Sequence, residues 1–114
     1  MTGSHLWSVS GYTLGEVKNY PLKISEQIEI PNIEDNTPDG IGKQIGAIIQ
    51  LFTEYYCNNR PDILIVTGDR YEMFGVGVAA CTLQIPMVHL CGGSVTTGAI
   101  DDVYRHSLTK MSQF

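Results

Sequence analysis

The most regular hydrophobic pattern in the chain lies between residues 38 and 58, where apolar side chains recur every three or four positions. This spacing places them on one stripe of a long amphipathic helix. Thr37-Pro38 suits the start of that helix, because the N–H that proline lacks would have no helical partner there. The sequence Asn-Asn-Arg-Pro at 58–61 is the expected end. The stripe consists of Ile41, Ile45, Ile48, Ile49, Phe52, Tyr55 and Tyr56.

Two short apolar runs follow, at residues 62–67 and 85–90. Continuous apolar, β-branched runs of this length are typical of parallel strands covered on both faces. Helices are predicted over 71–83 and from Ala99 or Ile100 through Met111. Gly75 and Gly77 weaken the first of these, since each costs ~1 kcal/mol relative to alanine in a helix interior. The alternation of helices and strands predicts an α/β fold with a parallel sheet and right-handed crossovers.

The first third of the chain is less regular. A short helix is predicted within residues 8–20, with Thr13 as N-cap and Glu16 at the third helical position. An extended segment is expected at 22–30, counted here as a strand, and a polar loop at 31–37. The predicted sheet looks incomplete at both ends.

Composition narrows the class of protein. The chain has 114 residues, about one domain, with 43% hydrophobic residues and a net charge of −5. An acidic chain without a basic cluster argues against nucleic acid and against an anionic membrane as the main partner. No apolar run approaches the ~20 residues that span a bilayer. The three scattered cysteines, Cys57, Cys81 and Cys91, are expected to be buried free thiols in a reducing cytoplasm.

Candidate chemistry follows each predicted strand. Asp69 comes directly after the first strand, where it could cap the next helix or, in a cleft, act as an acid or base or hold a sugar hydroxyl. Gly92-Gly93 follow the second strand, where they could let a ligand approach the backbone or simply form a turn. The dinucleotide fingerprint Gly-x-Gly-x-x-Gly is absent, so no cofactor is expected.

Charged pairs mark the last helix. Asp101 and Arg105 are four residues apart, as are Asp102 and His106. They are either surface ion pairs worth ~0.3–0.5 kcal/mol or a carboxylate and a guanidinium that face the same crevice as Asp69. His89 is expected to be a hydrogen-bonded core histidine and His5 a loop residue; neither has metal-ligand spacing, so no metal is expected.

Residues 60–73 and 98–112 resemble the UDP-N-acetylglucosamine 2-epimerase family, in the hydrolysing branch that feeds sialic-acid-type sugar synthesis. Residues 2–6 with 11–13 resemble the loop after that family's second strand. The resemblance implies a Rossmann-like parallel sheet with flanking helices, part of a glycosyltransferase-B type two-domain fold. It implies that residues 1–114 are a partial N-terminal domain, without the first strand and the whole second domain.

The reaction that the resemblance implies is elimination of UDP from a UDP-2-acetamido sugar, followed by hydration of the glycal to an N-acetylmannosamine-type sugar. Asp69 and Asp101 match catalytic carboxylates of the family. The implied partner is a UDP-sugar, bound by a homo-oligomeric full-length protein in the cytoplasm. Substrate-binding positions would be His5, Arg70, Gly92, Gly93, Arg105 and His106.

The chain departs from the family at two positions. Members often carry glutamate at the position of Cys91, of Ser94, or of both, whereas neither position holds a carboxylate here. This departure keeps open a second class of function, a non-catalytic α/β module that binds a sugar nucleotide or a partner subunit. A third alternative is an inactive fragment that exposes an unpaired sheet edge.

Overall fold

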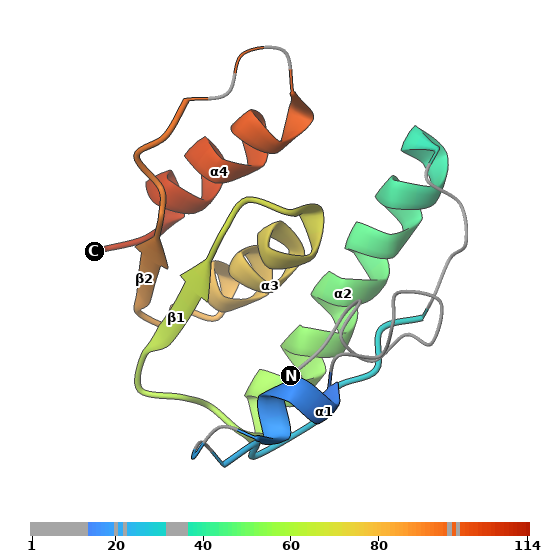
Figure 1. Ribbon diagram of the computed structural model, residues 1–114, viewed down its shortest axis with the longest axis vertical. Coiled ribbons are helices and arrows are strands. Elements are labelled where there is room, and N and C mark those ends of the chain that lie inside the picture. Colours follow the sequence, from blue (N-terminus) through green and yellow to red (C-terminus); the bar gives the residue numbers. More distant parts are fainter. Residues whose placement is uncertain (1–13, 20, 22, 32–36, 96, 98) are drawn as a thin grey trace.

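The computed structural model describes residues 14–19, 21, 23–31, 37–95, 97 and 99–114. Figure 1 shows α3 in the centre, with α2 on one side and α4 and the two strands on the other. The predicted alternation of helices and strands is confirmed from α2 onward. The elements are α1 (Leu14–Lys18), α2 (Pro38–Asn58), β1 (Leu64–Thr67), α3 (Tyr71–Thr82), β2 (Met87–Leu90) and α4 (Ile100–Met111).

The long helix α2 begins as the sequence predicts. The hydroxyl of Thr37 accepts a hydrogen bond from the Gly40 amide at 3.2 Å, and Pro38 occupies the first turn. Its most buried residues recur every four positions. Polar Gln44 is one of them, which the apolar stripe alone did not indicate. These residues are Gly40, Gln44, Ile48, Phe52 and Tyr56.

The strands β1 and β2 form a parallel pair, in which Leu64 is opposite Met87 and Thr67 is opposite Leu90. One face of the pair enters the core, where Val66 and Met87 are buried with α3 and α4 side chains. The other face is open: Ile65 is 61% exposed and Leu90 is 49% exposed. The expectation that both faces are covered is therefore wrong for the described part of the chain.

The extended segment expected at 22–30 does not become a strand. Residues 23–31 are irregular apart from an isolated bridge at Ile28. Ile30 is buried in the core and Ile28 packs against it. These side chains therefore contribute packing, while the two-stranded sheet consists of β1 and β2.

The other edge of β2 is paired by the end of the chain, which Figure 1 shows beside that strand. The Gln113 amide donates to the Met87 carbonyl at 3.0 Å, and the His89 amide donates to the Phe114 carbonyl at 2.9 Å. Both edges of β2 thus carry backbone hydrogen bonds.

The two glycines that weaken α3 as an isolated helix are the reason it fits between its neighbours. A Cβ added at Gly75 would lie 2.7 Å from Cγ2 of Ile48 on α2. A Cβ added at Gly77 would lie 2.5 Å from Cδ2 of Leu108 on α4. The glycines therefore let two helices approach α3 more closely than any other residue would allow.

The three free cysteines are exposed, so the prediction of buried thiols is wrong. Cys57 and Cys81 lie on the solvent side near the ends of α2 and α3, and Cys91 lies in the turn after β2. Among the described residues, no helix is long and apolar enough to cross a membrane.

Candidate functional site at the strand ends

The carboxyl ends of β1 and β2 meet at one edge of the sheet, where ligands of open α/β sheets bind. Gly68 ends β1 with φ of +86°, a left-handed conformation that favours glycine. Its amide donates to the Leu90 carbonyl at 3.4 Å. This turn places Asp69 at the carboxyl end of β1.

Arg105 of α4 connects this edge to the rest of the fold. Its guanidinium forms an ion pair with the Asp69 carboxylate through Nη2. Nη1 donates to the Ser94 carbonyl at 2.8 Å and lies 3.3 Å from Oδ1 of Asp102. The Arg105 side chain is only 8% exposed. It is therefore not part of a surface ion pair, and one buried guanidinium links the loop after β1, the loop after β2 and α4.

Asp69 does not take the capping role that was one of its predicted functions. The N-cap position of α3 belongs to Arg70, whose side chain makes no capping hydrogen bond. The Asp69 side chain is 29% exposed, so it reaches both Arg105 and solvent.

His89 joins the same loops from within β2. Its Nε2 lies 2.9 Å from the Gly68 carbonyl oxygen, and its Nδ1 lies 2.9 Å from Oγ1 of Thr109. The predicted hydrogen bonding of His89 is confirmed, but its side chain is half-buried and does not lie in the core. A Cβ added at Gly92 would lie 2.8 Å from Nδ1 of His89, so the missing side chain makes room for this contact inside the protein.

The remaining predicted residues are more loosely placed. Asp101, half-buried in the first turn of α4, makes no hydrogen bond or ion pair within the described part of the chain. His106 Nε2 lies 3.4 Å from Oδ2 of Asp102, and the His106 side chain is 53% exposed, as expected of a surface pair. Gly93 is exposed. His5 lies outside the described residues.

Arg70 and its neighbours form a second polar cluster, one element away from the Arg105 cluster. The Arg70 side chain is exposed, and its guanidinium makes two hydrogen bonds to Glu72, which is buried in the first turn of α3. The Tyr71 hydroxyl donates to Oε1 of the buried Gln44 at 2.8 Å. Neither Glu72 nor Gln44 was predicted from the sequence as a site residue. The only sign of either residue in the sequence is that a polar side chain stands among mostly apolar positions of a predicted helix.

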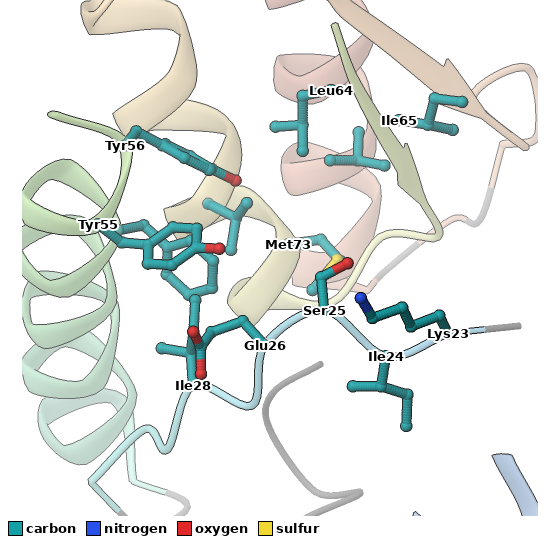
Figure 2. Close-up of a pocket in the computed structure, with 13 residues that line it drawn as sticks. Lys23, Ile24, Ser25, Glu26, Ile28, Tyr55, Tyr56, Leu64, Ile65 and Met73 are labelled. Atoms are coloured by element: carbon teal, nitrogen blue, oxygen red, sulfur yellow. The ribbon is translucent and has the colours of Figure 1, made fainter. Parts of the chain in front are cut away.

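A cavity of about 530 Å³ opens beside β1, as Figure 2 shows. Side chains of α2, β1, α3 and the segment 23–28 line it, most of them apolar. The lining includes Tyr56, whose pKa is raised to about 12, first by burial and then by the neighbouring Tyr55. None of its lining residues belongs to the strand-end clusters, so the cavity is separate from the candidate chemistry.

Comparison with known proteins gives the family. The model of the UDP-N-acetylglucosamine 2-epimerase family matches residues 1–114, the whole chain. The chain belongs to this family. The resemblance inferred from residues 60–73 and 98–112 is thereby confirmed.

Curated relatives of this epimerase-family chain are longer proteins. The GDP/UDP-N,N'-diacetylbacillosamine 2-epimerase (hydrolyzing) of Campylobacter jejuni is 39% identical over 111 residues, which are 97% of this chain and 28% of the relative. The polysialic acid biosynthesis protein P7 of Escherichia coli is 34% identical over 113 residues, 99% of this chain and 29% of that protein. The chain thus spans less than a third of the length of these relatives.

Solved structures show the same fold. The UDP-GlcNAc 2-epimerase of Neisseria meningitidis, solved with bound UDP-GlcNAc, matches with a TM-score of 0.81 and 20% identity over 99% of this chain and 30% of that one. The epimerase-family chain therefore has the Rossmann-like α/β arrangement of glycosyltransferase-B type proteins, as predicted. The assignment of residues 1–114 to a partial N-terminal domain stays a prediction.

Proposed function

We propose that this epimerase-family chain contributes one wall of the active site of a hydrolysing UDP-sugar 2-epimerase. The observation that carries the proposal is the anchored carboxylate of Asp69 at the carboxyl end of β1, held by the buried Arg105 of α4. A carboxylate in that position is accessible to a ligand yet fixed in direction, as acid–base chemistry requires.

The proposed reaction has two steps. A base removes the proton at C2 of a UDP-2-acetamido sugar, the bond between C1 and the diphosphate oxygen breaks, and UDP leaves with its electron pair. Water then adds to the glycal, its oxygen to C1 and a proton to C2, to give an N-acetylmannosamine-type sugar. Asp69 and Asp101 are the proposed acid and base. Arg70, Gly92, Gly93, Arg105, His106 and His5 are proposed to bind the substrate.

Two relatives support a UDP-sugar as substrate. The Campylobacter protein is named for GDP/UDP-N,N'-diacetylbacillosamine, and the Neisseria structure was solved with bound UDP-GlcNAc. We also propose that the full-length protein is a homo-oligomer and that it is cytoplasmic.

The test is UDP release from UDP-N-acetylglucosamine and from UDP-N,N'-diacetylbacillosamine. The protein would be a chimera in which this chain replaces the corresponding part of the Campylobacter relative. We expect release by the chimera and a loss of at least about 100-fold with Asp69→Asn or Asp101→Asn. A chimera that folds but releases no UDP would contradict the enzymatic proposal.

One observation favours a second function, a non-catalytic module that binds a sugar nucleotide. Members of the family often carry glutamate at the positions of Cys91 and Ser94, in the turn after β2. This chain has a thiol and a hydroxyl there instead, and both residues are exposed. Binding of UDP by the folded chimera without turnover would support this module. Restoring Cys91→Glu and Ser94→Glu would then be expected to produce turnover.

A further inference from the structure

Arg70 and Glu72 form an unusual pair at the start of α3, because one partner is exposed and the other is buried. The Arg70 side chain is 62% exposed, whereas the Glu72 side chain is 6% exposed. Nε of Arg70 donates to Oε2 of Glu72 at 3.0 Å, and Nη2 donates to Oε1 at 2.9 Å. Two parallel hydrogen bonds of this kind fix the plane of a guanidinium as well as its position.

The aromatic ring of Tyr71 restrains the same guanidinium from a second side. Cζ of Arg70 lies 5.7 Å from the centre of the Tyr71 ring. The ring is itself held by α2, because the Tyr71 hydroxyl donates to Oε1 of Gln44 and Nε2 of Gln44 donates to the Pro31 carbonyl. The hydrogen bonds to Glu72 also raise the pKa of Arg70 above its usual value, more than burial lowers it.

One nitrogen of the guanidinium is left over. In the part of the chain that the structure describes, Nη1 of Arg70 has no hydrogen-bond partner. It belongs to an exposed side chain next to Asp69, at the edge of the sheet where ligands of α/β folds bind. A guanidinium with a free nitrogen presents donors to an anion such as a diphosphate.

Stability alone does not account for a buried carboxylate at this position. Burial of a charged group is costly, and an apolar side chain of similar volume is often at least as stable. A buried Glu72 is useful if Arg70 must stay in one place before a ligand arrives, because a long side chain that is already ordered loses less conformational freedom on binding.

From this geometry we infer that Glu72 is a positioning residue, which holds Arg70 so that Nη1 faces the diphosphate of the nucleotide sugar. This inference rests on the proposed function for the ligand class, a nucleoside diphosphate. Glu72 does not touch the ligand itself; it acts through Arg70.

Calorimetric titration of the folded chain with UDP and with uridine tests the inference. In Glu72→Gln, we expect the affinity for UDP to fall about three- to tenfold, while the affinity for uridine is unchanged. In an Arg70→Ala background, Glu72→Gln should have no further effect, because the residue that it positions is gone. A residue that only stabilised the fold would give the same loss in both backgrounds.

Arg70→Lys provides a variant that does not disturb the buried carboxylate. Lysine keeps the charge but lacks the planar fork that matches Glu72. We expect it to bind UDP about as weakly as Arg70→Ala does. Binding as tight as in the wild type would show that charge suffices and would overturn the inference.

A measurement without ligand completes the test. The Nε–H signal of Arg70 in nitrogen-edited NMR spectra should be resolved and slow to exchange in the wild type, and should be lost in Glu72→Gln while the backbone signals persist. An unchanged signal would overturn the inference, as would a rise in UDP affinity in Glu72→Gln or a wild type that binds UDP no more tightly than uridine. A different result would contradict the epimerase proposal alone. In that case UDP binding depends on Glu72, but the chimera releases no UDP.

Discussion

The carboxylate of Asp69, directly after β1, is paired with the guanidinium of Arg105, which projects from α4 at the far end of the described chain. Because the Arg105 side chain is 8% exposed, this contact ties a potentially reactive carboxylate to the packed interior. Stability and the shape of the candidate site therefore depend on the same side chain.

Removing Arg105 should destabilise the protein strongly. Arg105→Ala removes the one donor that Asp69, Asp102 and the Ser94 carbonyl share, so we expect a loss of about 2–3 kcal/mol in the free energy of unfolding. Urea denaturation measures it. His106→Ala is the matched control, since its exposed pair with Asp102 should contribute less than about 0.5 kcal/mol. Equal losses in the two variants would contradict the role assigned to Arg105.

The close contact between α3 and α2 predicts opposite effects for two glycine substitutions. Gly75→Ala gains ~1 kcal/mol of helix propensity but forces its Cβ against the buried, β-branched Ile48, an overpacking that costs about 1–3 kcal/mol. We expect a net loss of up to about 2 kcal/mol by thermal or urea unfolding. Gly46→Ala on the exposed side of α2 meets nothing within 4 Å and should stabilise by about 0.5–1 kcal/mol. A stabilising Gly75→Ala would show that the two helices can separate at little cost.

The hydrogen bond between Tyr71 and Gln44 can be tested by removing one partner and then both. Tyr71→Phe leaves the buried amide oxygen of Gln44 unsatisfied, which should cost about 1–3 kcal/mol in unfolding free energy. Adding Gln44→Met should recover only part of this loss, because it removes the unpaired amide oxygen but also the donor to the Pro31 carbonyl. Losses that simply add in the double variant would mean that the two side chains are not coupled.

Alkaline pH should destabilise the protein through Tyr56. Its pKa is raised from 10.0 to about 12 in the folded protein, so between those values the unfolded chain loses the phenolic proton and the folded protein keeps it. The stability associated with Tyr56 is therefore full below pH 10 and falls by about 1.4 kcal/mol per pH unit from there to pH 12. Unfolding measured across this range should show a smaller decline in Tyr56→Phe. Identical slopes in the two proteins would contradict the buried position of this hydroxyl.

Periodicity predicted where α2, α4 and both strands lie, although the apolar runs of the strands also led to the wrong expectation that both faces of the sheet are covered. It undervalued α3, where Gly75 and Gly77 lower helix propensity and where the compensating contacts come from Ile48 and Leu108 on other elements. The same limit applies to Gln44 and Glu72. A polar residue is buried when a partner distant in the fold satisfies it, and no local pattern specifies that partner.

The sequence indicated candidate residues of the site but not the contacts between them. The i, i+4 spacing suggested that Arg105 pairs with Asp101, whereas Arg105 contacts Asp102 one turn away and Asp69 across the sheet edge. Such a pairing depends on how α4 packs on the strands. The role of Asp69 as an anchored carboxylate therefore required the structure, while the family came from the motifs alone.

The contacts of His89 connect three elements at this end of the sheet. A backbone carbonyl only accepts hydrogen bonds, so the Nε2 that faces the Gly68 oxygen must carry a hydrogen. The Nδ1 is in turn occupied by Thr109. Both ring nitrogens of His89 are therefore engaged, Nε2 with the turn after β1 and Nδ1 with α4, so this one side chain ties β1, β2 and α4 together beside Asp69.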